Sequence, residues 1–285
     1  MDQPSIILRT VCPDRPGLVS QLTSWISNYG GNIQHSDHHT DSAAGLFLSR
    51  IEWNTNSSML LNKKEINKEI TKISLQLNAK FQVNYSDEIP KVAIFESKQN
   101  HCLIDLLWRV RNGELKMTVP LIISNHPDFE YIANDFNAQF FYFDSSNISK
   151  SIVEKEILNL LNKFDIELVV LAKYMQILSD SFLKEFSSII NIHHSFLPAF
   201  KGSQPYHRAW QRGVKLIGAT AHYVTKDLDE GPIIDQCTVH VSHRDEIDDL
   251  IRKGRDIERI SLARAVRLHL NHQIFVYESK TAVFD

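Results

Sequence analysis

Two short polar segments in the C-terminal half of the chain carry side chains suited to acid–base chemistry. The first is Asn191-Ile192-His193-His194-Ser195, and the second is Asp227-Leu228-Asp229-Glu230-Gly231. An amide donor beside an imidazole can polarise a carbonyl group and exchange a proton, and a carboxylate can orient the imidazole or act on an attacking water. Taken singly, each segment also has a plainer interpretation, as a polar strand end or as a solvated turn.

The elements predicted around these segments favour a mostly parallel sheet with helices between the strands. The run 168–172 is continuously apolar, as in a strand buried on both faces. Ligands of such sheets bind beyond the carboxyl ends of the strands, which is where Asn191 and His193 fall. Because side chains alternate along a strand, these two are expected on one face and His194 on the other. The strands are predicted at 92–95, 119–124, 168–172, 189–193 and 217–224, and the helices at 102–110, 152–164 and 257–270.

The first 85 residues predict a different order of elements, β-α-β-β-α-β. Strands are predicted at 6–11, from 32, at 46–53 and at 81–85, with helices from 18 to a stop at 30–31 and over 66–77. Asp14 is predicted to cap the first helix, with Pro16 in its first turn. The polar stretch 86–88 before Pro90 is the best linker candidate, so two domains are expected, at 1–86 and 91–285.

Composition excludes several classes of protein. With 43% hydrophobic and 23% charged residues among 285, the chain fits a soluble globular protein. A net charge of −3 disfavours a nucleic-acid binder, and no apolar run approaches the ~20 residues needed to cross a membrane. Cys12, Cys102 and Cys237 form no closely spaced pair, which argues against disulfides and zinc. With no secretory signal at its start, a cytoplasmic protein is expected.

Taken together, the two polar segments resemble the formyltransferase fold family, which uses 10-formyltetrahydrofolate. The stretches that carry the resemblance are NIHHSFLPAFKG, from Asn191, and VTKDLDEGPII, from Val224. The family's hallmark is an Asn-x-His strand end with a downstream Asp just before a Gly. The resemblance covers about 91–285. It implies a Rossmann-like, mostly parallel-sheet domain in which Asn191, His193 and Asp229 are catalytic.

The resemblance also implies a folate site. Its pterin pocket would be lined by the run after the buried strand, together with the glycine of the second segment: Met175, Gln176, Ile177, Leu178 and Gly231. Gln176 departs from the arginine often found in the family's transferases, which leaves backbone contacts of Ile177 and Leu178 to bind the pterin. The folate is the substrate, and no cofactor or metal is implied.

The N-terminal region resembles an ACT domain, a ferredoxin-like βαββαβ fold. The motif is Asp14-Arg15-Pro16-Gly17, directly after the first predicted strand. The resemblance implies a site for an amino-acid effector, formed by Asp14, Arg15 and Gly17 with Asn32, and pairing of copies into a homo-oligomer. A helix start that is simply well capped is the plainer alternative. An ACT domain ahead of a formyltransferase domain is the arrangement of the formyltetrahydrofolate deformylase family, and His193-His194 in place of the transferases' His-Pro points the same way.

One physical feature separates hydrolase from transferase. Enzymes that formylate a phosphorylated amine hold its phosphate on a Gly-rich turn that opens a helix. The matching segment, 96–102, contains no glycine, and Glu96 would repel a phosphate if it faced the pocket. Water is then the available nucleophile. A formyltransferase to an amine and a non-catalytic folate or amino-acid sensor stay open as alternatives, with initiator tRNA disfavoured as acceptor by the acidic chain.

A histidine-rich segment, 34–39, looks at first like a metal site. His38 and His39 are adjacent, however, and in a strand they would face opposite sides. A structural zinc site usually needs four converging nitrogen or sulfur ligands, and no cysteine lies nearby. The segment is therefore interpreted as solvated or as part of an interface.

Overall fold

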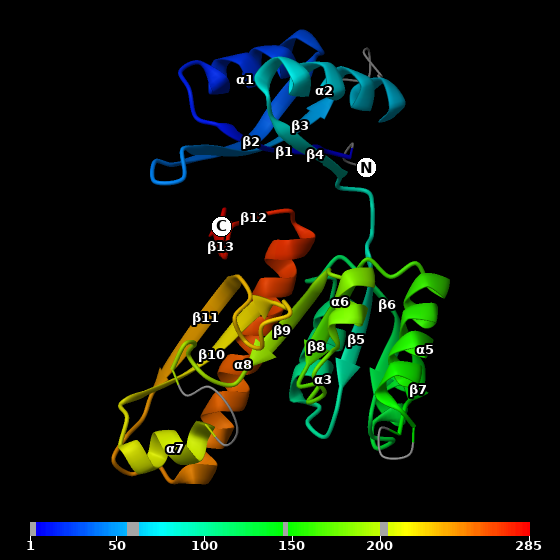
Figure 1. Ribbon diagram of the computed structural model, residues 1–285, viewed down its shortest axis with the longest axis vertical. Helices are drawn as coiled ribbons and strands as arrows, with labels where there is room; N and C mark the ends of the chain where they lie inside the picture. Colours follow the sequence, from blue (N-terminus) through cyan, green and yellow to red (C-terminus); the bar gives the residue numbers. More distant parts are fainter. Residues whose placement is uncertain (1–3, 56–62, 145–147, 200–204) are drawn as a thin grey trace. The chain divides into compact units, whose positions relative to one another are not determined.

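The computed structural model describes residues 4–55, 63–144, 148–199 and 205–285. Its internal contacts divide the chain into two compact units, Met1–Ile89 with Phe284–Asp285, and Pro90–Val283. Among the described residues, no helix is both long enough and apolar enough to span a membrane. The two units are described separately below (Figure 1).

The first unit is a four-stranded antiparallel sheet, in the order β2-β3-β1-β4, packed against two helices. Its elements confirm the predicted βαββαβ order: β1 (Ile6–Pro13), α1 (Leu18–Asn28), β2 (Gly31–Asp41), β3 (Leu46–Thr55), α2 (Lys63–Leu77) and β4 (Lys80–Tyr85). The apolar stripe predicted for the second helix, Ile66, Ile70, Ile73 and Leu77, is buried against the sheet. The 3.6-residue period of the sequence therefore placed the core of this unit.

The predicted cap of α1 is wrong. The helix begins at Leu18, its N-cap is Gly17 at φ 87°, and no side chain of the described residues caps it. Asp14 instead donates its backbone N–H to the Gly45 carbonyl at 2.9 Å. Glycine adopts this left-handed conformation without strain, so the chain turns at Gly17 and the helix starts three residues later than Asp14 would place it.

The second unit is built on a seven-stranded sheet in the order β11-β10-β9-β8-β5-β6-β7. Strands β5 to β9 are parallel, and β10 and β11 run antiparallel at one edge. Helices α3 and α8 pack on one face of the sheet and α5 and α6 on the other (Figure 1), and α4 packs on the same face as α3 and α8. The elements are β5 (Lys91–Glu96), α3 (His101–Arg111), β6 (Thr118–Ser124), α4 (Glu130–Asp135), β7 (Gln139–Tyr142), α5 (Lys150–Lys163), β8 (Leu168–Ala172), α6 (Asp180–Glu185), β9 (Ile189–His193), α7 (Pro205–Arg212), β10 (Leu216–Tyr223), β11 (Ile233–His240), α8 (Ile247–Leu270), β12 (Ile274–Tyr277) and β13 (Lys280–Val283).

The predicted mostly parallel sheet is confirmed, and β8 is buried along its whole length. The last helix is longer than the sequence predicts. It begins at Ile247, ten residues before the predicted start at Ile257. A capping box between Glu246 and Asp249 starts it. Its first turns are mostly polar, so the spacing of apolar residues does not indicate a helix there.

Strand order reverses between β5 and β8, which puts a ligand crevice at the carboxyl ends of these strands.

Candidate active site

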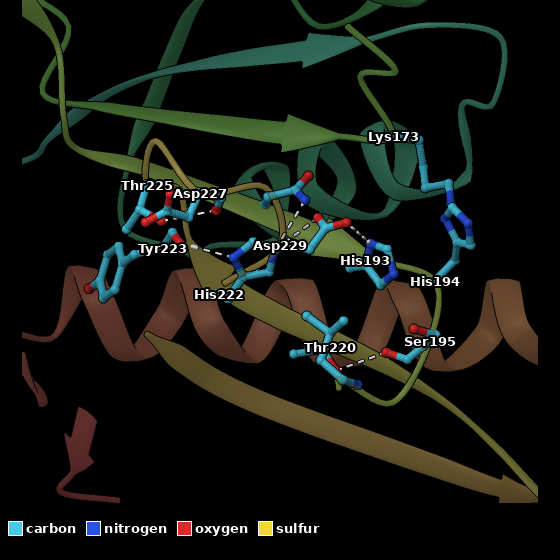
Figure 2. Close-up of polar contacts among 12 residues, drawn as sticks. Lys173, His193, His194, Ser195, Thr220, His222, Tyr223, Thr225, Asp227 and Asp229 are labelled. Carbon is cyan, nitrogen blue, oxygen red and sulfur yellow. Dashed lines mark hydrogen bonds and ion pairs between the residues drawn. The ribbon is translucent and has the colours of Figure 1, made fainter. Parts of the chain in front are cut away.

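The structure brings together the three side chains that the resemblance marks as catalytic. Asn191 and His193 lie on β9, and Asp229 lies in the loop between β10 and β11. The Nδ1 atom of His193 is 3.2 Å from Oδ2 of Asp229 (Figure 2). Asn191 and His193 line the same cavity, as the alternation along the strand predicts.

The Asp229 carboxylate determines where His193 carries its proton. An ionised carboxylate only accepts hydrogen bonds, so Nδ1 of His193 is the donor and Nε2 has a free lone pair. Nε2 is buried and has no hydrogen-bond partner among the described residues, although His193 lines the cavity. This arrangement leaves a proton acceptor without a partner on a side chain that lines the cavity.

The surroundings of Asp229 keep it ionised. Burial raises the pKa of the carboxyl group, but the hydrogen bond from His193 and the nearby histidines outweigh burial and hold the pKa below its usual range. Its backbone is left-handed, at φ 57°, a conformation that asparagine and aspartate tolerate better than most residues. Asp229 is therefore a fixed negative charge beside His193.

Gly231 shapes this loop, and it does not line the cavity in the described part of the chain. A Cβ atom built on Gly231 would lie 1.7 Å from the carbonyl oxygen of Tyr223. Glycine is needed here because the loop backbone packs directly on the end of β10. Gly231 therefore has a packing role in this loop, and its contact with folate stays a prediction.

His222 is a site residue that the sequence reasoning missed. It lies opposite Asn191 in the β9–β10 register, with its Nε2 3.2 Å from Nδ2 of Asn191 and 3.8 Å from Oδ1 of Asp229. Burial lowers the pKa of His222, so the ring is neutral. Alternation along β10 limits His222 to one of the two faces of the sheet, as it does for Asn191 on β9. Only the pairing register of the two strands shows that His222 lies opposite Asn191.

The cavity has a volume of about 760 Å³ and opens at the carboxyl ends of the strands. Drug-sized ligands occupy cavities of roughly this size. All four residues of the predicted pterin wall line it: Met175, Gln176, Ile177 and Leu178. Ser97 anchors this wall by accepting a hydrogen bond from the Met175 backbone and donating one to Asn125.

His194 does not face away from the site, as the strand alternation had predicted. Its ring stacks on that of His193, with centroids 4.9 Å apart and an angle of 14° between the planes, and it lines the same cavity. The strand ends at His193, so the alternation of side chains no longer holds at the next residue. His194 therefore belongs to the site.

The segment at 96–102 differs from a phosphate-binding turn in its side chains as well as in its lack of glycine. Glu96 is fully buried and does not line the cavity, so the direct repulsion of a phosphate by Glu96 does not apply. Burial raises the pKa of Glu96 to about 7, against the opposing effect of Ser124. Ser97, Lys98 and Gln99 line the cavity instead. The side chains of these three residues thus occupy the part of the cavity wall where a Gly-rich turn would expose backbone N–H groups.

The predicted effector residues do not come together within one copy of the first unit. Asp14, Arg15 and Gly17 follow the end of β1, where Arg15 donates to the Leu77 carbonyl at 3.3 Å. Asn32 lies near the start of β2 and pairs with Asn54 of β3. Pro13, at the end of β1, pairs with Leu46, which is eight residues away from Asn54 along β3. That offset is about 26 Å along the strand. An effector that touches both ends would need a second copy.

The histidine-rich segment lies on the edge strand β2, where His38 and His39 are exposed. His38 hydrogen-bonds Ser36 and Ser49. In the described part of the chain, three ligand atoms that lie within 4.8 Å of one another come from His101, Cys102 and Glu258. The Glu258 carboxylate is already engaged by ion pairs, so this cluster is better described as a buried charge network.

Comparisons with known proteins agree with this geometry. Residues 90–266 match the family model described as formyl transferase. The chain is 55% identical over 273 residues to formyltetrahydrofolate deformylase of Synechocystis sp., with 96% of each chain covered. It is 43% identical to the deformylase of Bacillus subtilis, covering 96% of this chain and 92% of the relative.

Solved structures show the same relationship. A formyltetrahydrofolate deformylase from Pseudomonas syringae superposes with a TM-score of 0.95 at 38% identity, covering 100% of this chain and 95% of that one. A glycinamide ribonucleotide transformylase from Symbiobacterium toebii covers 70% of this chain, with a TM-score of 0.67 and 28% identity. The expected fold class, a ferredoxin-like unit followed by a Rossmann-like unit, is confirmed. The chain belongs to the formyltetrahydrofolate deformylase family.

Proposed function

We propose that this protein hydrolyses 10-formyltetrahydrofolate to formate and tetrahydrofolate. The observation that carries the proposal is the unpartnered Nε2 of His193, whose proton position Asp229 sets, on a side chain that lines the same cavity as Asn191. A formyltetrahydrofolate deformylase that is 55% identical to this chain supports the same reaction.

Binding would place the pterin against the wall at 175–178 and the formyl group near Asn191. Met175 and Ile177 expose most of their apolar side chains, so covering them with a flat ring would remove apolar surface from water. Gln176 supplies polar contact in place of a charge. The folate is thus oriented by one apolar wall and one amide donor.

The chemical step would use His193 first as a base and then as an acid. Nε2 of His193 takes a proton from water as the water oxygen attacks the formyl carbon. The resulting oxyanion accepts a hydrogen bond from Nδ2 of Asn191, a type of contact worth ~10²–10³ in rate. The protonated imidazole, stabilised by Asp229, then gives its proton to N10 of the folate as the C–N bond breaks. Acid–base help of this kind is worth ~10²–10⁴.

This sequence of steps balances with water alone. The proton taken from water ends on N10 of tetrahydrofolate, and the formic acid released loses its own proton to solvent. No metal, nicotinamide or flavin enters any step, so we propose that the enzyme needs no cofactor.

The test is formate release from 10-formyltetrahydrofolate with no amine present. We expect turnover under these conditions, and no increase when primary amines are added. Formate or a formylated product that appears only when an amine is supplied would instead show a transferase. Tight folate binding without any turnover would show a sensor.

For the first unit, we propose an amino-acid effector site at Asp14, Arg15 and Gly17, with Asn32 contributed by a second copy of the chain. The βαββαβ order and the exposed loop after β1 support this proposal. Calorimetry against the common amino acids should find one that binds and changes the turnover rate. Light scattering should give at least a dimer at micromolar concentration, and a monomer would contradict the shared site.

We also propose a cytoplasmic location. Cys12, Cys102 and Cys237 are all free thiols in the structure. Free thiols are typical of proteins in a reducing compartment. Fractionation of cells that produce the protein would check this.

A further inference from the structure

A buried network of charged and polar side chains lies beside the site and has no part in the mechanism above. Lys173 Nζ is 3.2 Å from Oε1 of Glu258, and these side chains are only 6% and 1% exposed. Tyr206 donates its hydroxyl to the same Oε1 at 2.8 Å, and His101 Nε2 lies 2.7 Å from Oε2. Buried ion pairs of this kind require a specific geometry. The network therefore holds Lys173 in one place.

Lys173 makes a second contact, which reaches the site. Its Nζ lies 3.1 Å from Nδ1 of His194 (Figure 2). A lysine ammonium has hydrogens to donate and no lone pair, so Nδ1 of His194 must be the acceptor. In a neutral imidazole the proton then sits on Nε2. The charge partner of His194 thus assigns its tautomer.

The two stacked histidines have charge partners of opposite sign. His193 faces the Asp229 carboxylate, so it can hold protons on both ring nitrogens. A second proton on His194 would set Nδ1–H against the Lys173 ammonium, donor against donor. His193 can therefore exchange a proton, whereas His194 keeps a single one.

The other groups around His194 leave this result unchanged. Burial, Lys173 and His193 disfavour its protonated form, while Glu258 on α8 and Asp229 in the β10–β11 loop favour it. The first three outweigh the last two, and the pKa of His194 falls to about 3. The Tyr206 ring on α7 packs 6.3 Å from the imidazole, centroid to centroid, and adds no charge because burial raises its own pKa.

We propose that His194 is a non-titrating hydrogen-bond donor that binds the attacking water through Nε2–H, and that Lys173 and Glu258 are positioning residues that set its tautomer. This inference rests on the hydrolytic function proposed above. The water would donate one hydrogen bond to Nε2 of His193 and accept one from Nε2–H of His194. Its remaining lone pair is then free to attack the formyl carbon. During the step, the proton of the water passes to His193 and His194 keeps its own.

Nitrogen-15 NMR of the full-length protein, labelled at histidine, reads the tautomer directly. His194→Gln identifies the His194 signals by their loss. We expect the Nε2–H tautomer of His194, unchanged between about pH 5.5 and 8.5. An Nδ1–H tautomer, or titration of His194 within this range, would overturn the proposal whatever the activity of the enzyme.

Two substitutions of His194 test its contact with water. Glutamine places an amide N–H near the position of Nε2 and cannot titrate, whereas alanine has no donor. We expect kcat for amine-free formate release to fall about threefold to tenfold in His194→Gln and about 100-fold in His194→Ala, with KM within about threefold. Equal losses in both variants, or a fully active His194→Ala, would contradict the donor role.

The positioning residues are tested together. The double variant Lys173→Met/Glu258→Gln removes both buried charges at once, so that neither is left unpaired. With the ammonium gone, Nδ1 of His194 loses the donor that keeps a proton off this nitrogen, and we expect the Nδ1–H tautomer to appear beside the Nε2–H tautomer in the nitrogen-15 spectrum. A His194 tautomer unchanged from the wild type would show that Lys173 has no such role. If the double variant does not fold, the NMR measurement on the wild type decides.

The hydrolytic function and this inference fail in different ways. A wild-type protein that releases no formate without an amine would contradict the function. Amine-free release together with the wrong tautomer, or with a fully active His194→Ala, would contradict only the role of His194.

Discussion

Asn191 and His222 face each other across the antiparallel pair of β9 and β10, with Nδ2 of Asn191 3.2 Å from Nε2 of His222. Nδ1 of His222 lies 2.9 Å from the backbone carbonyl oxygen of Tyr223, so Nδ1 carries the proton and Nε2 accepts from the amide. This contact orients the amide of Asn191. One N–H is held by His222, and the other is left for the oxyanion.

Replacing His222 with phenylalanine should therefore damage catalysis more than binding. The ring volume is kept, but Asn191 loses the acceptor that orients its amide. We expect kcat for formate release to fall about 10- to 100-fold, which is less than the loss of the oxyanion donor itself, with KM changed less than about threefold. Tyr223→Phe is the matched control, because it removes a hydroxyl bonded to His269 and leaves the backbone carbonyl in place. Equal losses in both variants would argue against an orienting role.

Asp229→Asn should lower turnover by several orders of magnitude. The substitution keeps the size of the side chain but removes the charge that orients His193 and stabilises its protonated form. Folate binding should stay within about tenfold, or roughly 1.4 kcal/mol. Steady-state assays of formate release, together with equilibrium folate binding, give the two quantities. Near-normal release by this variant would contradict the proposed mechanism.

His193→Ala should be about as damaging as Asp229→Asn, and the double variant little worse than either. Groups that act as one catalytic unit are strongly non-additive. The kcat values of the two single variants and of the double variant, each divided by that of the wild type, form a double-mutant cycle. Losses that multiply in the double variant would mean that His193 and Asp229 act separately.

Glu96→Gln should stabilise the protein at alkaline pH and not at acidic pH. Glu96 is fully buried. Burial raises its pKa from 4.5 to about 7. Below pH 4.5 the group is protonated in the folded and unfolded states alike. As the pH rises through 7, the folded state must bury a charge that the unfolded state exposes to water, so stability is lost.

The expected gain for Glu96→Gln at pH 8 is about 1–2 kcal/mol in the free energy of unfolding, allowing for partial screening of the charge. Urea unfolding followed at pH 4.5 and pH 8 measures this. Glu185→Gln is the control, because Glu185 is exposed on α6 and should show no such pH dependence. A gain of the same size at both pH values would point to packing and not to charge.

Gly254→Ala should destabilise the protein, although alanine is normally favoured over glycine inside a helix by about 1 kcal/mol. A Cβ atom on Gly254 would lie 2.1 Å from the hydroxyl oxygen of Tyr206 and 2.3 Å from the adjoining ring carbon. Displacing the ring should cost about 1–3 kcal/mol. In a Tyr206→Ala background the clash is absent, and the same substitution should become neutral or stabilising. Unfolding free energies of the four proteins test this, and the same sign in both backgrounds would rule out the clash.

The sequence by itself determined most of the elements and one face of the site. Apolar periods of 3.6 and 2 residues placed most helices and strands, because burial of apolar side chains is the main stabilising term in folding. Alternation along a single strand put Asn191 and His193 on one face, since that relationship needs no other part of the chain.

The tertiary structure decided the contacts between elements. His222 lies 31 residues from Asn191, and Glu258 lies 85 residues from Lys173. Strand register and helix packing bring these pairs together, and neither is encoded in local spacing. His194 was misplaced for a related reason. The backbone leaves the strand after His193, so alternation ends there, and the direction of the next side chain depends on the packing of the loop and on the charge of Lys173.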